Sequence, residues 1–212
     1  MTEMKIKELT VETFVHRLAQ GSATPGGGSV AALSGALSAS LCAMVGRLTA
    51  EKPKYRQVWA EMEEMVLEAD RMAERLLDLA DQDIAAYDQV MAAMKMPKTD
   101  PKEQESRTEA IQRATRQATL VPLNTLKILG DLVGFIEKAV TRGNLNCLSD
   151  AGVALVLTRG AALGASYNVR INLLSIKDLS GKKSLKTELD LICDRIFPSL
   201  ERLGLILEER LG

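Results

Sequence analysis

The most regular feature of the sequence is a stripe of apolar residues that recurs every three or four positions between residues 58 and 94. The stripe consists of Val58, Met62, Met65, Ala69, Met72, Leu76, Ala80, Tyr87, Met91 and Met94. This spacing is typical of one face of an α-helix, and charged residues fill most of the other faces. We therefore predict an amphipathic helix over 54–95, which would be about 60 Å long at 1.5 Å per residue. That length favours a bend or a protruding hairpin.

A second apolar stripe, from 111 to 140, continues the helical pattern. Residues 97–101 read PKTDP, in which the first proline ends one helix and a capping oxygen ahead of the second begins the next. The two stripes therefore predict a helical hairpin. Within the second stripe, Pro122 is expected to kink or split the helix, and Gly143 to end it.

The segment from 18 to 46 has no charged residue, and its helical part, 30–46, is made mostly of small residues. Seventeen residues are near the lower limit for spanning a bilayer, but serine and glycine lower the apolarity. A buried helix that packs closely against others accounts for the same composition.

Two more helices are predicted toward the C-terminus. One is capped by Ser149, and the other is capped by Ser184 and has a break at Pro198. No run of alternating strand residues is present. We predict an all-α fold, a bundle of about five long helices with a central small-residue helix and a protruding hairpin, forming a single domain over residues 1–212.

Composition narrows the chemistry. The 27 basic and 28 acidic residues give a net charge of -1, which argues against a general nucleic-acid binder, and 3% aromatic residues leave the core to aliphatic side chains. With His16 the only histidine, Ser-His-Asp, Cys-His and His-rich metal sites within one chain are disfavoured. No disulfide framework or metal site is supported by the three distant cysteines, Cys42, Cys147 and Cys193. Acid–base chemistry is therefore expected from carboxylates.

The cysteine usage favours a reducing compartment, because a disulfide framework is typical of secreted domains. The charged residues Lys5, Lys7 and Glu8 have no apolar run behind them, so we expect no secretory signal peptide. A cytoplasmic protein without a membrane span fits these observations.

The first segment that carries chemistry is TPGGGS at 24–29. Gly26, Gly27 and Gly28 allow the backbone to approach a ligand closely, and Ser29 can cap a helix whose N-terminal amides attract anions. Gly26, Gly28 and Ala31 also match the spacing of a dinucleotide fingerprint, but no strand precedes them. The alternative is a tight turn that leads into a closely packed helix.

Asp83 is the second candidate because it lies on the apolar face of the predicted helix 54–95. A carboxylate there must be paired, hydrogen-bonded or raised in pKa, and each case is commoner at functional sites than on an ordinary surface. A structural ion pair or a different helix phase is the alternative. Asp81 and Asp88 lie off the stripe and are expected to be solvated.

The third candidate is polar positions within 143–150 and 164–178. Asn168 and Asn172 share a helical face, where their amides can bind neighbouring backbone groups or a heterocycle. Arg170 projects elsewhere and can hold a substrate carboxylate or form a surface salt bridge. Cys147 is expected to be a small buried residue rather than a nucleophile.

In this order, the three segments resemble the formiminotetrahydrofolate cyclodeaminase family, which includes the C-terminal domain of bifunctional formiminotransferase-cyclodeaminase and stand-alone methenyltetrahydrofolate cyclohydrolases. The most specific matches are TPGGGS at 24–29, GNLNCLSD at 143–150 and NVRINL at 168–173, supported by MKMPK at 94–98. The resemblance implies an all-helical fold, a reduced folate substrate, no tightly bound cofactor or metal, and a homodimer or larger homo-oligomer. Because this chain lacks a formiminotransferase domain, a separate formiminotransferase is a candidate partner.

The resemblance implies an enzyme that converts 5-formiminotetrahydrofolate to 5,10-methenyltetrahydrofolate and ammonia, with methenyltetrahydrofolate cyclohydrolase as the alternative. A non-catalytic folate-binding or oligomeric scaffold is a third reading. Asp83 or Asp150 is the candidate acid–base group. Candidate substrate-binding residues are the glycine turn with Ser29, the amides of Asn146, Asn168 and Asn172, and, for the glutamate tail, Arg170 and Lys177.

Overall fold

The computed structural model describes residues 5–212 and contains six α-helices joined by short connections. They are α1 (Val11–Ala19), α2 (Gly27–Ala50), α3 (Trp59–Met94), α4 (Pro101–Arg142), α5 (Leu148–Leu174) and α6 (Leu179–Leu211). Three short 3₁₀ helices span Ile6–Glu8, Pro53–Val58 and Leu145–Cys147, and residues 5–212 contain no strand. The all-α fold with about five long helices is confirmed, because α2 to α6 each have 24 residues or more.

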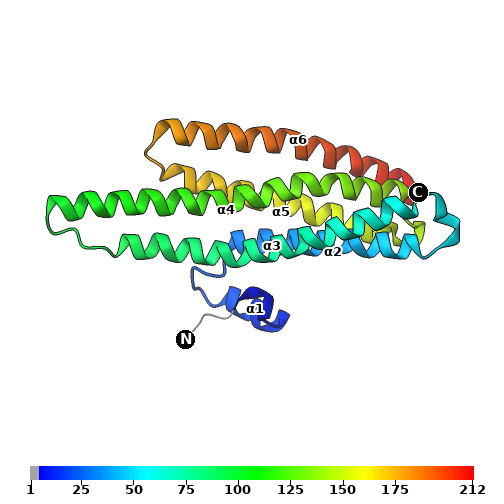
Figure 1. The fold of residues 1–212 in the computed structure, drawn as a ribbon, viewed down its shortest axis with the longest axis horizontal. Coiled ribbons are helices and arrows are strands. Elements are labelled where there is room, and N and C mark those ends of the chain that lie inside the picture. Colours follow the sequence, from blue (N-terminus) through cyan, green and yellow to red (C-terminus); the bar gives the residue numbers. More distant parts are fainter. Residues whose placement is uncertain (1–4) are drawn as a thin grey trace.

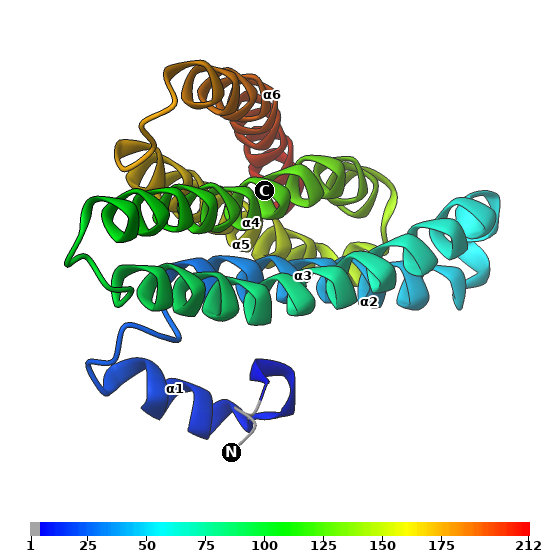
Figure 2. The same cartoon turned by 60° about the vertical axis from the view of Figure 1, so that its left-hand side comes forward.

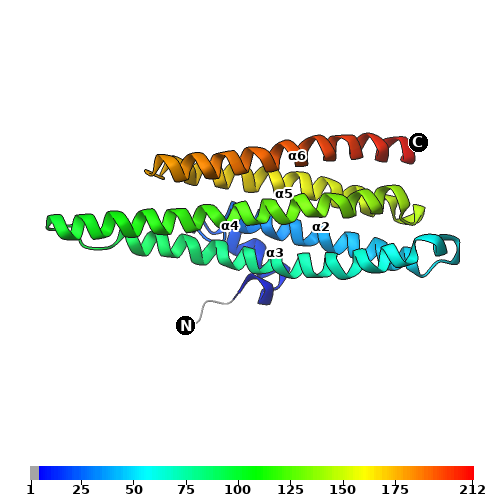
Figure 3. The ribbon, with the colours of Figure 1, turned by 45° about the horizontal axis from the view of Figure 1, so that its top comes forward.

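The five long helices run along one axis (Figure 1). α2 packs against α3, α5 and α4, and α6 lies along α5 and α4 (Figure 3). The ends of α3 and α4 form the hairpin that extends beyond the rest of the bundle (Figure 1), as the sequence predicts. The short helix α1 is set apart from the long helices at the side of α2 and α3 (Figure 2). The sequence analysis did not predict α1.

The hairpin connection follows the predicted pattern. Asp100 caps α4 by accepting a hydrogen bond from the Glu103 backbone N–H at 2.9 Å, and Pro101 occupies the first turn. α3 begins at Trp59 rather than at 54, because Tyr55 leaves the helical conformation (φ −106°, ψ 18°) within the preceding 3₁₀ helix. The prediction of 54–95 thus has the correct buried face and ends within one residue of Met94, but it begins five residues too early.

Pro122 does not split α4, which runs through it without interruption. Proline has no N–H, so it cannot bond the carbonyl four residues earlier, which belongs to Ala118. Asn172 on α5 donates to this carbonyl oxygen through Nδ2 at 2.9 Å. A side chain of the neighbouring helix therefore satisfies the group that the proline leaves free. Pro198 likewise lies inside α6 and does not end it.

Three predicted caps are wrong. Ser149 lies inside α5, and the turn before that helix is instead closed by Asn144, whose Oδ1 accepts from the Asn146 N–H at 3.1 Å. Ser184 lies inside α6, which Asp178 caps through the N–H groups of residues 180 and 181. Ser29 lies inside α2, which begins at Gly27. In each case an asparagine, aspartate or glycine three to six residues earlier begins the helix or the turn before it.

The small residues of α2 let it pack closely in the bundle. A Cβ added to Gly35 would lie 2.8 Å from a methyl carbon of Leu129 on α4, so a side chain at this position would clash. Ser38 is fully buried and donates to the carbonyl oxygen of Ala154 on α5 at 2.7 Å. Close backbone approach, rather than large side chains, therefore joins α2 to its neighbours.

Three helical segments are long and apolar enough to cross a membrane by length and composition: Gly27–Ala50, Pro101–Arg142 and Leu145–Leu174. In the structure, 56%, 61% and 50% of the most apolar 18-residue stretch of each segment, respectively, is buried among the other helices. Packing within the bundle therefore accounts for much of this apolarity.

Candidate active site

The first turn of α2 meets α3 and α5 at the point where two of the predicted polar residues lie. A Cβ added to Gly28 would overlap the carboxylate of Asp83 on α3, at 2.6 Å from its Cγ. A Cβ added to Gly27 would lie 3.6 Å from Nδ2 of Asn168 on α5. The glycines therefore leave the space that the carboxylate occupies and bring the amide close, and the structure joins the glycine turn, Asp83 and Asn168 in one place.

Asp83 is half-buried beside α2, and its nearest polar partner is Ser29. The fully buried Ser29 hydroxyl lies 3.0 Å from Oδ2 of Asp83 and 3.2 Å from the carbonyl oxygen of Ala80, so its single proton serves either acceptor. Burial raises the pKa of the Asp83 carboxyl, and the hydrogen bonds from Ser29 offset part of this rise. The net shift is upward, which favours a carboxyl that holds its proton more readily than an exposed aspartate.

Asp81 differs from its prediction. It is half-buried, and its Oδ1 accepts a hydrogen bond from the backbone N–H of Ile6 at 2.6 Å. Its Oδ2 is buried and has no hydrogen-bond partner within residues 5–212. Asp88 is exposed, as predicted. The N-terminal segment that covers Asp81 was not predicted from the sequence, so its burial was not foreseen.

Asn168 and Asn172 are both half-buried on the same side of α5. Asn168 Nδ2 donates to the Gly164 carbonyl oxygen at 2.9 Å, and Asn172 Nδ2 donates to Ala118. Both side-chain oxygens lack a hydrogen-bond partner among residues 5–212. Each amide is thus oriented by one bond through its nitrogen and has an acceptor oxygen available for a ligand.

The GNLNCLSD segment lies at the other end of α2. The Asn144 N–H donates to Thr49 Oγ1 at 2.9 Å, and Asn144 Nδ2 donates to the Leu48 carbonyl oxygen at 3.3 Å. Asp150 is half-buried in the first turn of α5, eighteen residues before Asn168 and thus about 27 Å away along the helix. Within one chain, the structure does not bring Asp150 or the exposed Asn146 to Asp83.

The two predicted cations are exposed. Arg170 follows Asn168 by two residues and so points about 200° around α5 from it. Lys177 lies just past α5, where its backbone N–H donates to Gln112 Oε1 at 2.8 Å. Neither side chain forms an ion pair within the described part of the chain. Both remain predictions for a substrate carboxylate.

Cys147 is buried, and burial raises the pKa of its thiol, as expected for a packed cysteine rather than a nucleophile. Residues 5–212 contain no group of three histidine, cysteine or acidic side chains arranged to hold a metal ion.

Sequence reasoning missed the partnership of Ser29 with Asp83, which joins residues 54 positions apart. It also missed the position of Ala118, whose freed carbonyl orients Asn172. The signal for the latter was present, because Pro122 on a buried stripe leaves the carbonyl four residues earlier without its helical partner.

Three kinds of comparison relate the chain to known proteins. The family model described as formiminotransferase-cyclodeaminase matches residues 10–191. A methenyltetrahydrofolate cyclohydrolase of Methylorubrum extorquens is 35% identical over 181 residues, which cover 85% of this chain and 87% of that protein. The formimidoyltransferase-cyclodeaminase of Rattus norvegicus is 35% identical over 176 residues, covering 83% of this chain but only 32% of that protein.

A solved structure is similar along nearly the whole chain. The formiminotetrahydrofolate cyclodeaminase of Thermotoga maritima superposes with a TM-score of 0.88 at 30% identity, covering 98% of this chain and 100% of that one. The chain thus spans most of two stand-alone proteins and about a third of the bifunctional one.

Proposed function

The chain belongs to the formiminotransferase-cyclodeaminase family, and from this premise we propose that it converts 5-formiminotetrahydrofolate to 5,10-methenyltetrahydrofolate and ammonia. The observation that carries the proposal is the half-buried Asp83 carboxyl at the glycine turn, with a raised pKa and a serine partner. The similar stand-alone cyclodeaminase of Thermotoga maritima supports the choice of reaction.

The reaction requires a proton at the leaving nitrogen. N10 of the substrate attacks the formimino carbon and forms a tetrahedral intermediate, in which the former imine nitrogen must leave as ammonia. A carboxylic acid that is protonated near neutral pH can supply that proton, which is the task of a general acid. Burial favours the protonated form of Asp83, and the Ser29 hydroxyl can stabilise the carboxylate that remains.

The alternative reaction is the hydrolysis of 5,10-methenyltetrahydrofolate to 10-formyltetrahydrofolate. The 35% identity to the cyclohydrolase of Methylorubrum extorquens over most of both chains favours it as the second candidate. In this reaction the carboxylate of Asp83 would take a proton from the attacking water and return one to N5 as the ring opens. The same side chain thus serves either reaction, in opposite starting protonation states.

We propose that the amides of Asn168 and Asn172 orient the pterin or the reacting nitrogens, since their carbonyl oxygens lack partners among residues 5–212. We assign the glutamate tail of the substrate to Arg170 and Lys177.

We further propose that the protein acts in the cytoplasm and that a separate formiminotransferase supplies its substrate.

The proposal includes a homodimer through the outer face of α5. An apolar stripe of exposed side chains runs along this helix: Val153, Val156, Leu163, Tyr167, Ile171 and Leu174. The single chain exposes 11956 Å², roughly a quarter more than the ~9,600 Å² expected for a compact monomer of 23.0 kDa. An apolar helix face of this length is typical of an interface with a second copy.

The dimer can be tested by Val156→Glu, which would place a charge in the middle of the α5 stripe. The variant should be monomeric by light scattering at concentrations where the wild type is dimeric. Leu191→Glu, at an exposed position on α6, is the matched control and should not change the mass. A monomeric wild type at tens of micromolar would contradict the dimer.

The activity is tested by the ultraviolet absorbance of methenyltetrahydrofolate. Its appearance from 5-formiminotetrahydrofolate, with release of ammonia, would support the cyclodeaminase. Accelerated loss of added methenyltetrahydrofolate would support the cyclohydrolase. If the purified chain changed neither rate, the enzymatic proposal would be wrong and a binding scaffold would be the better description.

A further inference from the structure

The apolar stripe of α3 continues past the level at which α2 begins. The first turn of α2 at Gly27 and Gly28 lies against Asp83 and Asn168. Beyond these contacts α3 runs on for eleven residues, to Met94, which is about 16 Å at 1.5 Å per residue. The last part of the inward face of α3 is therefore not covered by α2.

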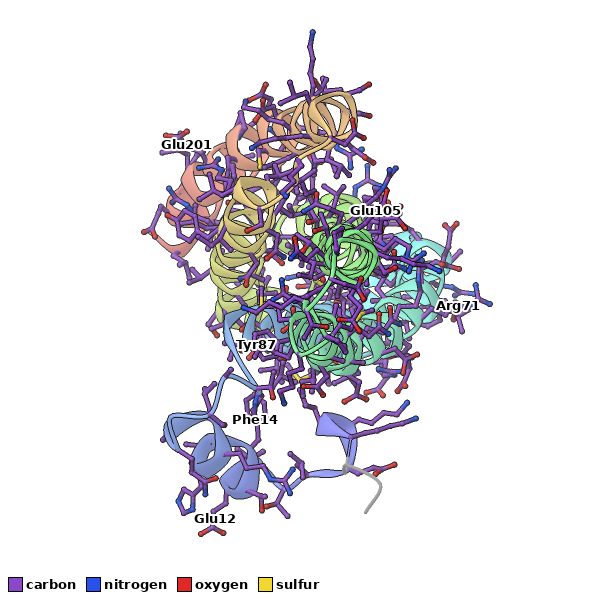
Figure 4. The ribbon with its side chains drawn as sticks, turned by 90° about the vertical axis from the view of Figure 1, so that its left-hand side faces the viewer. Glu12, Phe14, Arg71, Tyr87, Glu105 and Glu201 are labelled. Carbon is purple, nitrogen blue, oxygen red and sulfur yellow. The ribbon has the colours of Figure 1, made fainter. Side chains whose placement is uncertain are left out.

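Exposure along the stripe changes at this point. Met62, Met65 and Leu76 on the same face are fully buried. One turn after Asp83, Tyr87 is 37% exposed, and Met94 is 47% exposed. Figure 4, viewed from the hairpin end, shows Tyr87 on the side of α3 toward the segment that leads into α2. A helical face that is buried for most of its length thus ends in an uncovered surface next to the carboxylate.

The chemistry of this surface suits a flat, uncharged ring. Tyr87, Met91 and Met94 supply an aromatic ring and two thioethers without a formal charge. Aromatic rings stack on flat heterocycles, and thioether sulfur makes favourable contacts with ring edges. The Tyr87 hydroxyl has no hydrogen-bond partner within residues 5–212, so it remains available to a ligand.

We propose that Tyr87, with Met94, forms the platform on which the ring system of the folate substrate lies, while its one-carbon group reaches Asp83. This inference rests on the proposed function, because it takes the ligand to be a reduced folate. The occupant is the substrate rather than a second copy, since the platform adjoins the carboxyl group, whereas the apolar stripe assigned to dimer formation lies on the outer face of α5.

Isothermal titration with 5-formyltetrahydrofolate as the probe tests the platform. Tyr87→Ala should raise the Kd about tenfold, the size expected for the loss of one stacking contact, whereas Tyr87→Phe should stay within about twofold. Met94→Gln, which removes the thioether and keeps the length, should raise it about threefold. Leu67→Ala, at an exposed position on α3 away from Asp83, is the matched control and should bind like the wild type.

Turnover separates the platform from the acid–base group. At saturating substrate, Tyr87→Ala should keep kcat within about threefold and raise KM, because the ring contact is made equally in ground and transition states. Unchanged affinity of Tyr87→Ala would overturn the platform, and so would an equal loss in Leu67→Ala. A lower oligomer mass for Tyr87→Ala with unchanged Kd would instead place the residue in an interface.

Failure of the proposed function has a different signature. A wild type that binds the probe without turnover would refute the enzyme and leave the platform to be decided by the Kd values of its variants. A wild type that does not bind the probe would overturn both.

Discussion

Polar side chains meet both ends of α2, but their hydrogen bonds differ between the two ends. At the C-terminal end, Asn144 commits its backbone N–H and both side-chain atoms to Thr49, Leu48 and Asn146. At the N-terminal end, Asp83 has a single side-chain partner among residues 5–212, Ser29, and lies against glycine instead of a side chain. The polar groups of Asn144 are thus all used in hydrogen bonds within the chain, whereas the carboxyl group of Asp83 remains available to a ligand.

This difference indicates which end of α2 is suited to catalysis. A fully satisfied buried network stabilises a turn and leaves few groups for a ligand. A partly buried carboxyl with a raised pKa costs stability and gains reactivity. We therefore propose that the hydrogen bonds around Asn144 serve folding and that Asp83 serves catalysis.

The largest effect on kcat should come from replacing Asp83, and it should far exceed the effect of replacing Asp150. Asp83→Asn should lower kcat by about 10²- to 10⁴-fold, the range expected for loss of a general acid or base. Asp150→Asn, at the opposite end of the bundle, should lower it by less than about tenfold. Methenyltetrahydrofolate absorbance measures both, and circular dichroism shows that each variant is folded. A greater loss in Asp150→Asn would reverse the comparison.

Gly28→Ala should have the next largest effect, because its Cβ would overlap the Asp83 carboxylate. Displacing that group by about 1 Å should lower kcat about 100-fold, and overpacking should cost about 1–3 kcal/mol of stability in urea. The control is Gly134→Ala on α4, where a Cβ meets no atom within 4 Å. That variant should keep full activity and gain about 0.5–1 kcal/mol from its higher helix propensity. Wild-type kinetics in Gly28→Ala would show that the close contact is not needed.

Asn144→Ala tests the C-terminal end of α2, where we expect a loss of stability rather than of activity. Losing one donated and one accepted side-chain hydrogen bond in a 7% exposed site should lower the free energy of unfolding by about 2–3 kcal/mol. The backbone bond to Thr49 remains available, so the chain should still fold. kcat of the folded fraction should stay within about threefold. A large loss of kcat with normal stability would mean that this end takes part in catalysis. The exposed Asn124→Ala on α4 is the control, and it should lower neither the stability nor kcat.

The smallest effect is a gain in stability for Asp83→Asn near neutral pH. Burial raises the folded-state pKa above its unfolded value, so ionisation of Asp83 opposes folding. This penalty is absent below the unfolded pKa, near 3.8, and develops as pH rises through the folded pKa. Thermal unfolding should therefore show a higher Tm for the variant at pH 7, with the difference shrinking toward pH 4. An unchanged or lower Tm at pH 7 would contradict the stability cost.

Much of the fold was predictable, because apolar residues at helical spacing and the PKTDP signal act locally. The face of α3 and the hairpin at Asp100 follow directly from them. The caps near Ser149 and Ser184 were misplaced because several residues at each boundary can cap a helix, and tertiary packing selects among them. α1 was missed although Thr10 caps it, since only Phe14 on that helix is buried.

The site was predictable only in part. A lone acid on an apolar stripe drew attention to Asp83, and that position is indeed half-buried against α2. Its hydrogen bond to Ser29 and the separation of Asp150 from it depend on how helices far apart in sequence align. Helical periodicity fixes faces but not the register between helices, so those relations needed the structure.

The most direct test of the central claim, that Asp83 supplies the catalytic proton, is the pH profile of kcat for wild type and Ser29→Ala on 5-formiminotetrahydrofolate. A required acid loses activity as pH rises through its pKa, so the wild-type rate should fall toward alkaline pH. Ser29 stabilises the charged carboxylate, so removing its hydroxyl should move that alkaline limb to higher pH. An alkaline limb that stays at the same pH in Ser29→Ala would show that the proton comes from another group.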